Sequence, residues 1–173
     1  ILYKSTRGVE EGTVTASQAI LQGLAKDGGL FVPTEHPKLD VTLEKLKDMS
    51  YQETAYAVMK QLLTDFTEEE LMHCINSAYD SKFDTEEIAP LVDADGAYYL
   101  ELFHGSTIAF KDMALSILPY LLTTAAKKNQ VKNDIVILKF LCYDWRVRPD
   151  LHNDCFIRHS LNSDDLSVVG STE

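Results

Sequence analysis

Two stretches in the first half of the chain carry apolar residues at the three- and four-residue spacing of an amphipathic helix, and each follows a capping box. Ser50 to Glu53 and Thr67 to Glu70 have the pattern in which a hydroxyl and a carboxylate satisfy free amides at a helix start. The apolar positions that follow are Ala55, Val58, Met59, Leu62 and Leu63 in the first stretch, and Leu71, Ile75 and Ala78 in the second. The pattern predicts two helices in a small helical module with an acidic solvated face.

Shorter elements are predicted on the N-terminal side of these helices. Residues 2–6 alternate like a short strand, and residues 30–32 indicate a buried one. Between them the sequence predicts a helix that is capped by the Ser17 hydroxyl and ended by Gly28-Gly29. Residues 42–46 are expected to form one or two helical turns. The apolar face of the capped helix is expected to comprise Ala19, Ile20 and Leu24.

The second half of the chain alternates strand-like and helical segments. Asp93 to Gly96 is a turn signal between strand-like stretches at residues 91–92 and 98–103. A long apolar segment follows with the length of a helix, and Pro119 within it predicts a kink or a restart because proline lacks an amide donor. The apolar run Ile135 to Leu138 is typical of a buried parallel strand. Strand, helix and strand in this order predict a βαβ unit and an α/β fold.

Composition and periodicity both change near residue 140. Residues 1–139 contain every lysine of the chain and one arginine, whereas residues 140–173 contain no lysine, three arginines and the single tryptophan. The tail also lacks a convincing amphipathic helix, and Val168-Val169 is its one strand-like stretch. Two interpretations fit: a linker or disordered tail, and a tail translated out of frame, which would change residue usage and destroy the patterning together.

The overall composition is that of a globular protein with an acidic surface. The 173 residues are 45% hydrophobic and 25% charged, and 16 Lys and Arg against 27 Asp and Glu give a formal net charge of −11. This charge argues against a general binder of nucleic acid or of an anionic membrane. The sequence shows no membrane-spanning stretch and no signal peptide, so a cytoplasmic location is expected. Three cysteines without a CxxC pair predict neither a disulfide framework nor a metal site.

Residues 104–112 concentrate the residue types that do chemistry. Gly105 permits a close backbone approach, Ser106 and Thr107 carry hydroxyls, and Lys111 follows two apolar residues. An amine in an apolar setting at a helix start loses its proton more easily, through desolvation and through the positive end of the helix dipole. A neutral amine can attack a carbonyl and form a Schiff base. On the residues alone, a solvated lysine at a helix start is the more common use of such a position.

Two motifs carry a resemblance to a known family. Tyr3 to Gly8, followed by Asp27 to Pro33, resembles the N-terminal region of threonine synthases. The run His104-Gly105-Ser106-Thr107-Ile108-Ala109-Phe110-Lys111-Asp112 is similar to the lysine motif of the same family, which belongs to the fold-type II pyridoxal-phosphate enzymes. The two motifs stand in the family order, and the resemblance extends over residues 2–138.

The resemblance implies a domain organisation. Residues 1–90 would form a small, mostly helical N-terminal domain of the threonine synthase type. Residues 91–139 would begin a doubly wound, pyridoxal-phosphate-binding α/β domain that is truncated after about one βαβ unit. Residues 140–173 would be the aberrant tail.

The resemblance also implies a lyase of threonine biosynthesis. Lys111 would form the Schiff base with pyridoxal 5′-phosphate and serve as the catalytic proton shuttle, Phe110 would pack the cofactor site, and Asp112 would be a polar neighbour. The family converts O-phospho-L-homoserine and water to L-threonine and phosphate, and the cofactor stabilises the carbanions. His104 is expected to shape its loop rather than to act as an acid or base. Arg7 would either attract the substrate phosphate or be paired structurally.

Some family features are absent from this sequence. Ser106 stands where the family commonly has proline, and Lys139 to Asp144 stand where it has a loop of the Ser-Gly-Asp-Thr-Gly type. The later Gly-rich cradle for the cofactor phosphate has no counterpart. We therefore expect an incomplete and inactive piece of a threonine synthase. The alternatives are a non-catalytic interaction module from a truncated gene and a threonine-synthase-like phospholyase that acts on a related phosphorylated amino compound.

Overall fold

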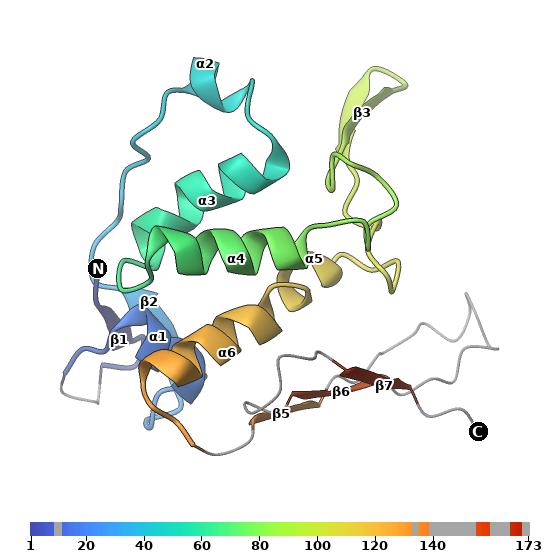
Figure 1. Cartoon of the computed structure of the whole chain (residues 1–173). Helices are drawn as coiled ribbons and strands as arrows, with labels where there is room; N and C mark the ends of the chain where they lie inside the picture. Colours follow the sequence, from blue (N-terminus) through green and yellow to red (C-terminus); the bar gives the residue numbers. More distant parts are fainter. Residues whose placement is uncertain (9–11, 133–134, 139–154, 160–166, 171–173) are drawn as a thin grey trace. The chain divides into compact units, whose positions relative to one another are not determined.

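The structure, a computed structural model, describes residues 1–8, 12–132, 135–138, 155–159 and 167–170 (Figure 1). The chain divides into two compact units, Ile1–Asn129 and Gln130–Glu173. The elements of the first unit are, in order, β1 (Tyr3–Ser5), α1 (Ala16–Gln22), β2 (Phe31–Pro33), α2 (Leu43–Leu46), α3 (Tyr51–Leu62), α4 (Glu68–Ala78), β3 (Leu91–Ala94), β4 (Ala97–Leu100), α5 (Asp112–Leu115) and α6 (Leu118–Lys128).

Helices α3 and α4 begin at the two predicted capping boxes. The Ser50 hydroxyl accepts a hydrogen bond from the Glu53 amide, and the Glu53 carboxylate accepts one from the Ser50 amide at 2.7 Å. Thr67 and Glu70 form the same reciprocal pair at the start of α4. The predicted inward stripe of α4, which comprises Leu71, Ile75 and Ala78, is fully buried. Both predicted helices are therefore confirmed, and so is the short helix α2.

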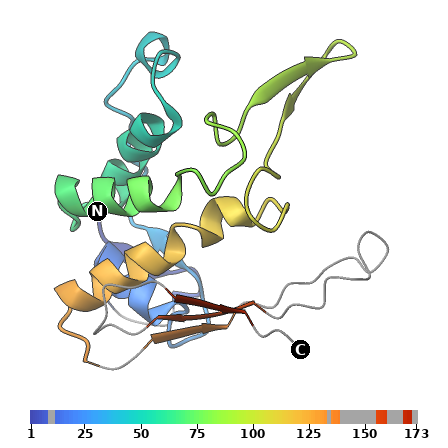
Figure 2. The same cartoon turned by 45° about the vertical axis from the view of Figure 1, so that its right-hand side comes forward.

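The core of the first unit lies where α4 crosses α6. Figures 1 and 2 show α4 between α3 and α6, while α1 packs against α6. The buried side chains of this cluster come mainly from α4, from the loop after it and from α6; they include Leu71, Cys74, Ile75, Phe83, Ile88, Leu121 and Ala125. Ile117, which lies between α5 and α6, belongs to the same buried cluster.

The N-terminal elements differ in detail from those expected. β1 and β2 pair antiparallel, with Lys4 opposite Val32, which confirms that both strands exist. β2 is half-buried rather than buried as expected, and Leu30 lies outside it and is exposed. The cap of α1 is Thr15 rather than Ser17, because the Thr15 hydroxyl accepts from the Gln18 amide. Ser17 lies inside the helix and is buried. Leu24 lies beyond the helix and is 58% exposed, so its expected place on the apolar face was wrong. The sequence keeps the helical spacing of apolar residues up to Leu24, but the backbone leaves the helix after Gln22.

The hairpin and the restarted helix follow the sequence pattern closely. β3 and β4 pair antiparallel around Asp95 and Gly96, both of which have positive φ as a tight hairpin turn requires. β4 ends at Leu100, three residues earlier than expected. The apolar segment after residue 111 is broken into α5 and α6, with Pro119 in the first turn of α6, where a missing amide donor costs nothing.

The second unit contains the three strands β5 (Ile135–Leu138), β6 (Cys155–His159) and β7 (Ser167–Gly170) in one antiparallel sheet. β5 is a strand as predicted, and its described partner β6 runs antiparallel to it. An apolar run signals burial without fixing the direction of the neighbouring strand. Val168-Val169 lies in β7 as expected. The rest of the tail lies outside the described residues, so its two interpretations stay predictions, as do the domain boundaries.

A search of the described residues for a helix long and apolar enough to cross a membrane finds none.

Candidate active site around Lys111

Lys111 stands immediately before α5 and is half-buried at the edge of an open cavity of about 740 Å³. The cavity is lined by Tyr51 of α3, by Ala89, Leu100 and Leu102 around the hairpin, and by Phe110, Lys111, Met113, Ala114 and Leu115. Among these lining residues Lys111 supplies the single amine. The structure thus brings both predicted site residues, Lys111 and Phe110, to one largely apolar cavity.

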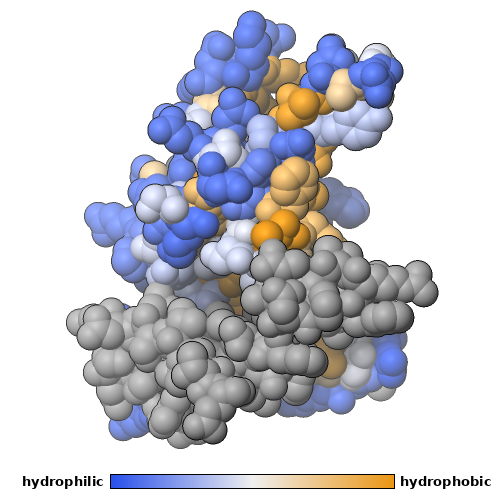
Figure 3. Space-filling model, turned by 90° about the vertical axis from the view of Figure 1, so that its right-hand side faces the viewer, coloured by the Kyte–Doolittle hydropathy of each residue, from blue (hydrophilic) through white to orange (hydrophobic). Residues whose placement is uncertain are grey.

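Apolar side chains around this cavity remain exposed on the surface. Phe110 is 74% exposed and Ile108 is 69% exposed. Every residue of the β3–β4 hairpin is exposed, although its strands carry Leu91, Val92, Tyr98, Tyr99 and Leu100. Figure 3, which faces the side of the molecule that carries the hairpin, shows apolar surface interrupted by polar groups. Leu100 and Phe110, which line the cavity, are thus themselves exposed.

Asp112 builds the loop that presents Lys111. Its carboxylate is buried, and it accepts hydrogen bonds from both the amide and the hydroxyl of Thr107, each at 2.7 Å. Gly105 packs against the same side chain, because a Cβ at Gly105 would lie 2.5 Å from the Asp112 Cβ. The glycine of the motif is thus explained by a close approach to Asp112, and the role of Asp112 is structural. Sequence reasoning left that role open.

The same loop contains a strained residue. Ile108 has φ of +56°, a conformation that costs free energy for a β-branched side chain. Its amide donates to the Gly105 carbonyl at 3.0 Å, so a tight turn stands three residues before Lys111. The helix after Lys111 has only four residues, and its dipole is weaker than that of the long helix expected from the sequence.

His104 lies between two carboxylates. Its Nδ1 is 2.5 Å from Oδ1 of Asp84, and its Nε2 is 2.9 Å from Oε2 of Glu101. Hydrogen bonds to Glu101 and to Asp84 raise the pKa of the His104 imidazole above its ordinary value. The prediction that His104 shapes its loop agrees with this geometry. Sequence reasoning missed both carboxylates, because residues 101–104 form no helix that would make their spacing informative and Asp84 is 20 residues from His104.

The N-terminal motif is a structural turn. The Ser5 hydroxyl donates to Oδ1 of Asp27 at 2.7 Å, and the Gly29 amide donates to the same oxygen at 2.9 Å. A Cβ at Gly29 would lie 2.1 Å from the Ser5 Oγ, so this position needs glycine. Arg7 donates from Nη1 to the Asp27 carbonyl at 3.0 Å. Arg7 was expected either to attract the substrate phosphate or to be paired structurally, and the structure shows the structural pairing.

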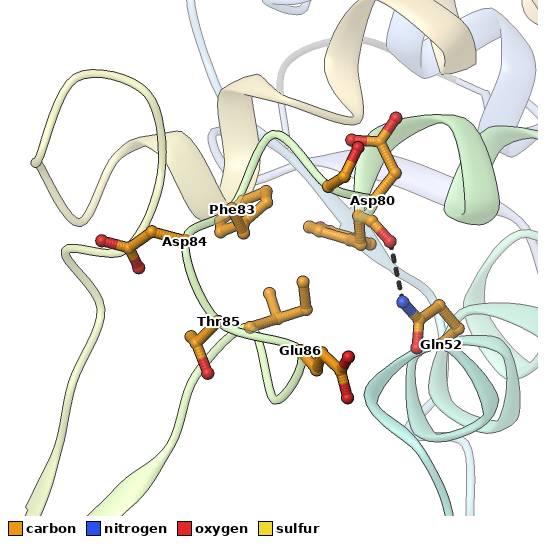
Figure 4. A pocket seen from close by; sticks show the side chains of 9 residues that line it. Gln52, Asp80, Phe83, Asp84, Thr85 and Glu86 are labelled. Carbon is orange, nitrogen blue, oxygen red and sulfur yellow. Dashed lines mark hydrogen bonds between the residues drawn. The ribbon is translucent and has the colours of Figure 1, made fainter.

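A second, smaller pocket of about 370 Å³ opens beside the loop that follows α4 (Figure 4). Gln52 donates to the Tyr79 carbonyl across it at 2.7 Å. Asp80 is paired with Lys82 at 2.8 Å, and the Asp84 side chain is directed outward, away from Gln52. Within the described residues no group of three or more His, Cys, Asp or Glu side chains is arranged to hold a metal ion.

Comparison with known proteins identifies relatives of this N-terminal unit. The family described as Threonine synthase N terminus matches residues 2–79. A threonine synthase from Eremothecium gossypii is 41% identical over 123 residues, and one from Saccharomyces cerevisiae is 38% identical over 123 residues. Each of these matches covers 66% of this chain and 24% of the relative, so the chain spans about a quarter of the length of these curated relatives.

Solved structures agree with the sequence matches. The crystal structure of the yeast threonine synthase superposes with a TM-score of 0.68 at 34% identity and covers 76% of this chain and 28% of that one. A threonine synthase from Brucella melitensis, solved with bound pyridoxal phosphate, gives 0.66 at 34% identity and covers 75% of this chain and 28% of that one. The fold of the matched part is thus similar to that of part of these threonine synthases, and residues 2–79 match the family described as Threonine synthase N terminus.

Proposed function

We propose that this chain is the N-terminal portion of a pyridoxal-phosphate-dependent threonine synthase and that Lys111 is its cofactor-binding lysine. What supports the proposal is the position of the Lys111 amine at the edge of an apolar cavity, within a chain whose N-terminal part matches threonine synthases. Lys111 therefore offers an amine that can act as a nucleophile, and Phe110 and Met113 offer a surface on which an aromatic ring can pack.

The cavity residues fit one part of the cofactor. Lys111 would hold pyridoxal phosphate through Nζ, while Phe110 and Met113 would contact the ring with apolar and aromatic surface. The phosphate group needs a cradle of close backbone amides, and the described lining of the cavity contains no glycine. In this proposal the cradle belongs to the part of a threonine-synthase-length protein that lies outside this chain.

The chain's own residues have distinct tasks in this site. When bound, pyridoxal phosphate supplies an electron sink for carbanions next to the substrate amino group. The Lys111 amine holds the cofactor and, when free, carries a proton at Nζ to and from the substrate carbons. The Asp112–Thr107 bonds keep the residue before α5 in place, and Phe110 adds aromatic surface to the same cavity. We expect the isolated chain to capture the cofactor without turning over O-phospho-L-homoserine, because only one wall of the site is present.

Cofactor capture tests the proposal directly. The full chain is incubated with pyridoxal phosphate, treated with borohydride to fix any covalent adduct, and mapped by peptide mass spectrometry. We expect preferential modification of Lys111 over the other lysines, and loss of that selectivity in Lys111→Met. Lys45→Met, on the exposed surface of α2, is the matched control and should leave modification of Lys111 unchanged. Equal modification of all lysines would overturn the proposal.

A chimera tests the reaction. Residues 2–132 replace the aligned segment of the Saccharomyces cerevisiae threonine synthase, and phosphate release from O-phospho-L-homoserine is measured. We expect activity in the chimera and none after Lys111→Ala. An inactive chimera that folds and binds the cofactor would argue against the reaction assigned here.

A second substrate class has support of its own. Human threonine synthase-like 1 is 38% identical over 110 residues and covers 61% of this chain and 15% of that protein, a similarity comparable to that of the threonine synthases. A threonine-synthase-like phospholyase is therefore the alternative within the same enzyme class. To distinguish a threonine synthase from such a phospholyase, the same chimera is given O-phospho-L-homoserine and related phosphorylated amino compounds. The compound from which phosphate is released identifies the substrate.

A non-catalytic interaction module is the alternative outside that class. The exposed apolar residues of β3 and β4 favour it, because an isolated two-stranded hairpin is marginally stable in water. An interaction module would show no selectivity for Lys111 in the borohydride experiment. The same measurement therefore distinguishes this reading from the enzyme.

A further inference from the structure

His104 joins three segments of the first unit at one point. Its ring nitrogens meet Asp84, from the loop after α4, and Glu101, from the end of the hairpin. The Asp84 amide also donates to the His104 carbonyl at 3.1 Å. The Phe103 ring stacks on the imidazole with a centroid distance of 4.7 Å and an interplanar angle of 28°. The next residue along the chain is Gly105, which packs against Asp112, so the imidazole stands at the entrance to the loop that carries Lys111.

The chemistry of the two partners determines the protonation of the ring. An ionised carboxylate only accepts hydrogen bonds, whereas a neutral imidazole has one N–H and can donate to one partner. Two carboxylates, one on each ring nitrogen, are satisfied together only by the doubly protonated imidazolium. The arrangement is therefore complete when His104 carries a positive charge.

We propose that protonated His104, bonded to Asp84 and Glu101, is a positioning residue that holds the 104–112 loop and thereby places Lys111, and that the loop loosens when His104 loses its proton. We call His104, Asp84 and Glu101 the histidine clasp. The effect on Lys111 rests on the proposed function, whereas the clasp itself does not. His104 acts through the loop and touches none of the reacting atoms.

The direction of the pH dependence follows from the same contacts. The titratable groups that face His104 are Glu101 and Asp84, and both raise the pKa of the imidazole above its ordinary value. The clasp is therefore closed below that ordinary value and opens as the pH rises through the raised one. The His104 and Glu101 side chains are 14% and 28% exposed, whereas that of Asp84 is 75% exposed, so solvent screens the Asp84 contact more strongly.

A titration of the full chain tests the clasp without any cofactor. The nitrogen and proton resonances of the His104 ring are followed by NMR against pH in the wild-type protein, in Glu101→Gln and in Asp84→Asn. We expect each variant to lower the pKa of His104, because each replaces a negatively charged carboxylate beside the ring with a neutral amide. Glu86→Gln removes the same charge two residues from Asp84, from an exposed side chain that does not bond His104, and should leave the titration in place. A His104 titration that both clasp variants leave unchanged would overturn the clasp.

The rate of borohydride-fixed capture at Lys111 tests positioning. It is measured across the pH range in the wild-type protein and in His104→Gln, and the ratio of the two rates removes the pH dependence that the two proteins share. We expect a ratio of about two to five below the raised pKa of His104, the range for a partly exposed ion pair, falling to about one above it. A ratio that does not change with pH means that His104 is merely structural, and it overturns the positioning role.

Asp84→Asn keeps this second test independent of folding defects in His104→Gln. An asparagine can both donate and accept, so it satisfies a neutral imidazole as well as a charged one. The ratio of the capture rate of Asp84→Asn to that of His104→Gln should therefore stay the same across the pH range. A ratio that falls with pH as it does for the wild-type protein contradicts the proposal. If no variant and no wild-type protein captures the cofactor at Lys111, the proposed function fails and the positioning role falls with it, while the NMR titration still decides the clasp.

Discussion

Asn129 donates a 2.9 Å hydrogen bond from its side-chain amide to the hydroxyl of Ser17, and the two residues are 112 positions apart in the chain. The bond joins the C-terminal end of α6 to the first turn of α1, where Ser17 is buried. The helix that follows the Lys111 segment is thereby tied to the N-terminal module. The two ends of the first unit are thus held together by a polar contact as well as by the core.

A double-mutant cycle should detect this contact. We expect Ser17→Ala to lower the free energy of unfolding by about 1 kcal/mol, because it removes a buried acceptor. Asn129→Ala should cost a similar amount, and the double variant should lose less than the sum, by about 0.5–1 kcal/mol. Urea unfolding measures all four proteins. Strict additivity would show that the bond contributes nothing to stability.

The Thr107–Asp112 pair predicts a local effect on the loop. Thr107→Val removes the hydroxyl donor to Asp112 and should cost about 1 kcal/mol in urea unfolding, with faster hydrogen exchange at the amides of residues 107 and 108. Asp112→Ala leaves the Thr107 amide without its acceptor and should cost more than Thr107→Val. The reverse order of the two variants would contradict the role given to Asp112.

Gly105 should tolerate no side chain. Gly105→Ala places a Cβ 2.5 Å from the Asp112 Cβ, so either the loop or Asp112 must move. We expect a loss of about 1–3 kcal/mol in the free energy of unfolding, together with slower cofactor capture at Lys111. Ser106→Ala, at the exposed neighbouring position, is the control and should change stability by less than about 0.5 kcal/mol. Equal stability of the two variants would show that the loop relaxes freely.

Asp65 predicts a loss of stability in acid. Burial pushes the pKa of Asp65 upward, but hydrogen bonds from Ser17 and Thr15 outweigh it, so the pKa is lowered overall. A carboxyl whose pKa is lower in the folded state stabilises the fold above its unfolded pKa, and this contribution disappears as the pH falls through the folded value. Asp65→Asn should therefore flatten the acid limb of the stability profile, measured by urea unfolding from neutral pH down to below the ordinary pKa of an aspartate. An unchanged acid limb would mean that other carboxylates dominate it.

The elements predicted best are those whose signals are local. The capping boxes at Ser50 and Thr67 specify where α3 and α4 begin, because the hydroxyl, the carboxylate and the amides they join lie within four residues. Pro119 specifies the restart at α6 for the same reason. The start of α1 was missed by two residues because Thr15 and Ser17 are both acceptable caps, and the tertiary bonds of Ser17 to Asn129 and Asp65 favour Thr15. The predicted end of α1 at Gly28-Gly29 was also wrong, because the helix ends at Gln22 and its C-cap is Gly23.

Part of the candidate site was also within reach of the sequence. Lys111 and Phe110 were predicted from the motif that contains them, and both line one cavity, although their roles stay predictions. The sequence did not predict that Tyr51 and Leu100 also line that cavity, because they come from α3 and β4 and no sequence spacing relates them to Lys111. Their meeting depends on how α3 and the hairpin pack around α5.

The sequence by itself determined the starts of α3 and α4, the hairpin turn and the break at Pro119, because each of these depends on residues close together along the chain. It also carried the motifs that resemble those of threonine synthases. Tertiary structure alone decided that Asp84 would reach His104, that Asp112 would require glycine at position 105, and that β5 would pair with an antiparallel neighbour. These contacts depend on distances between segments, and such distances follow from the packing of the whole unit rather than from any local propensity.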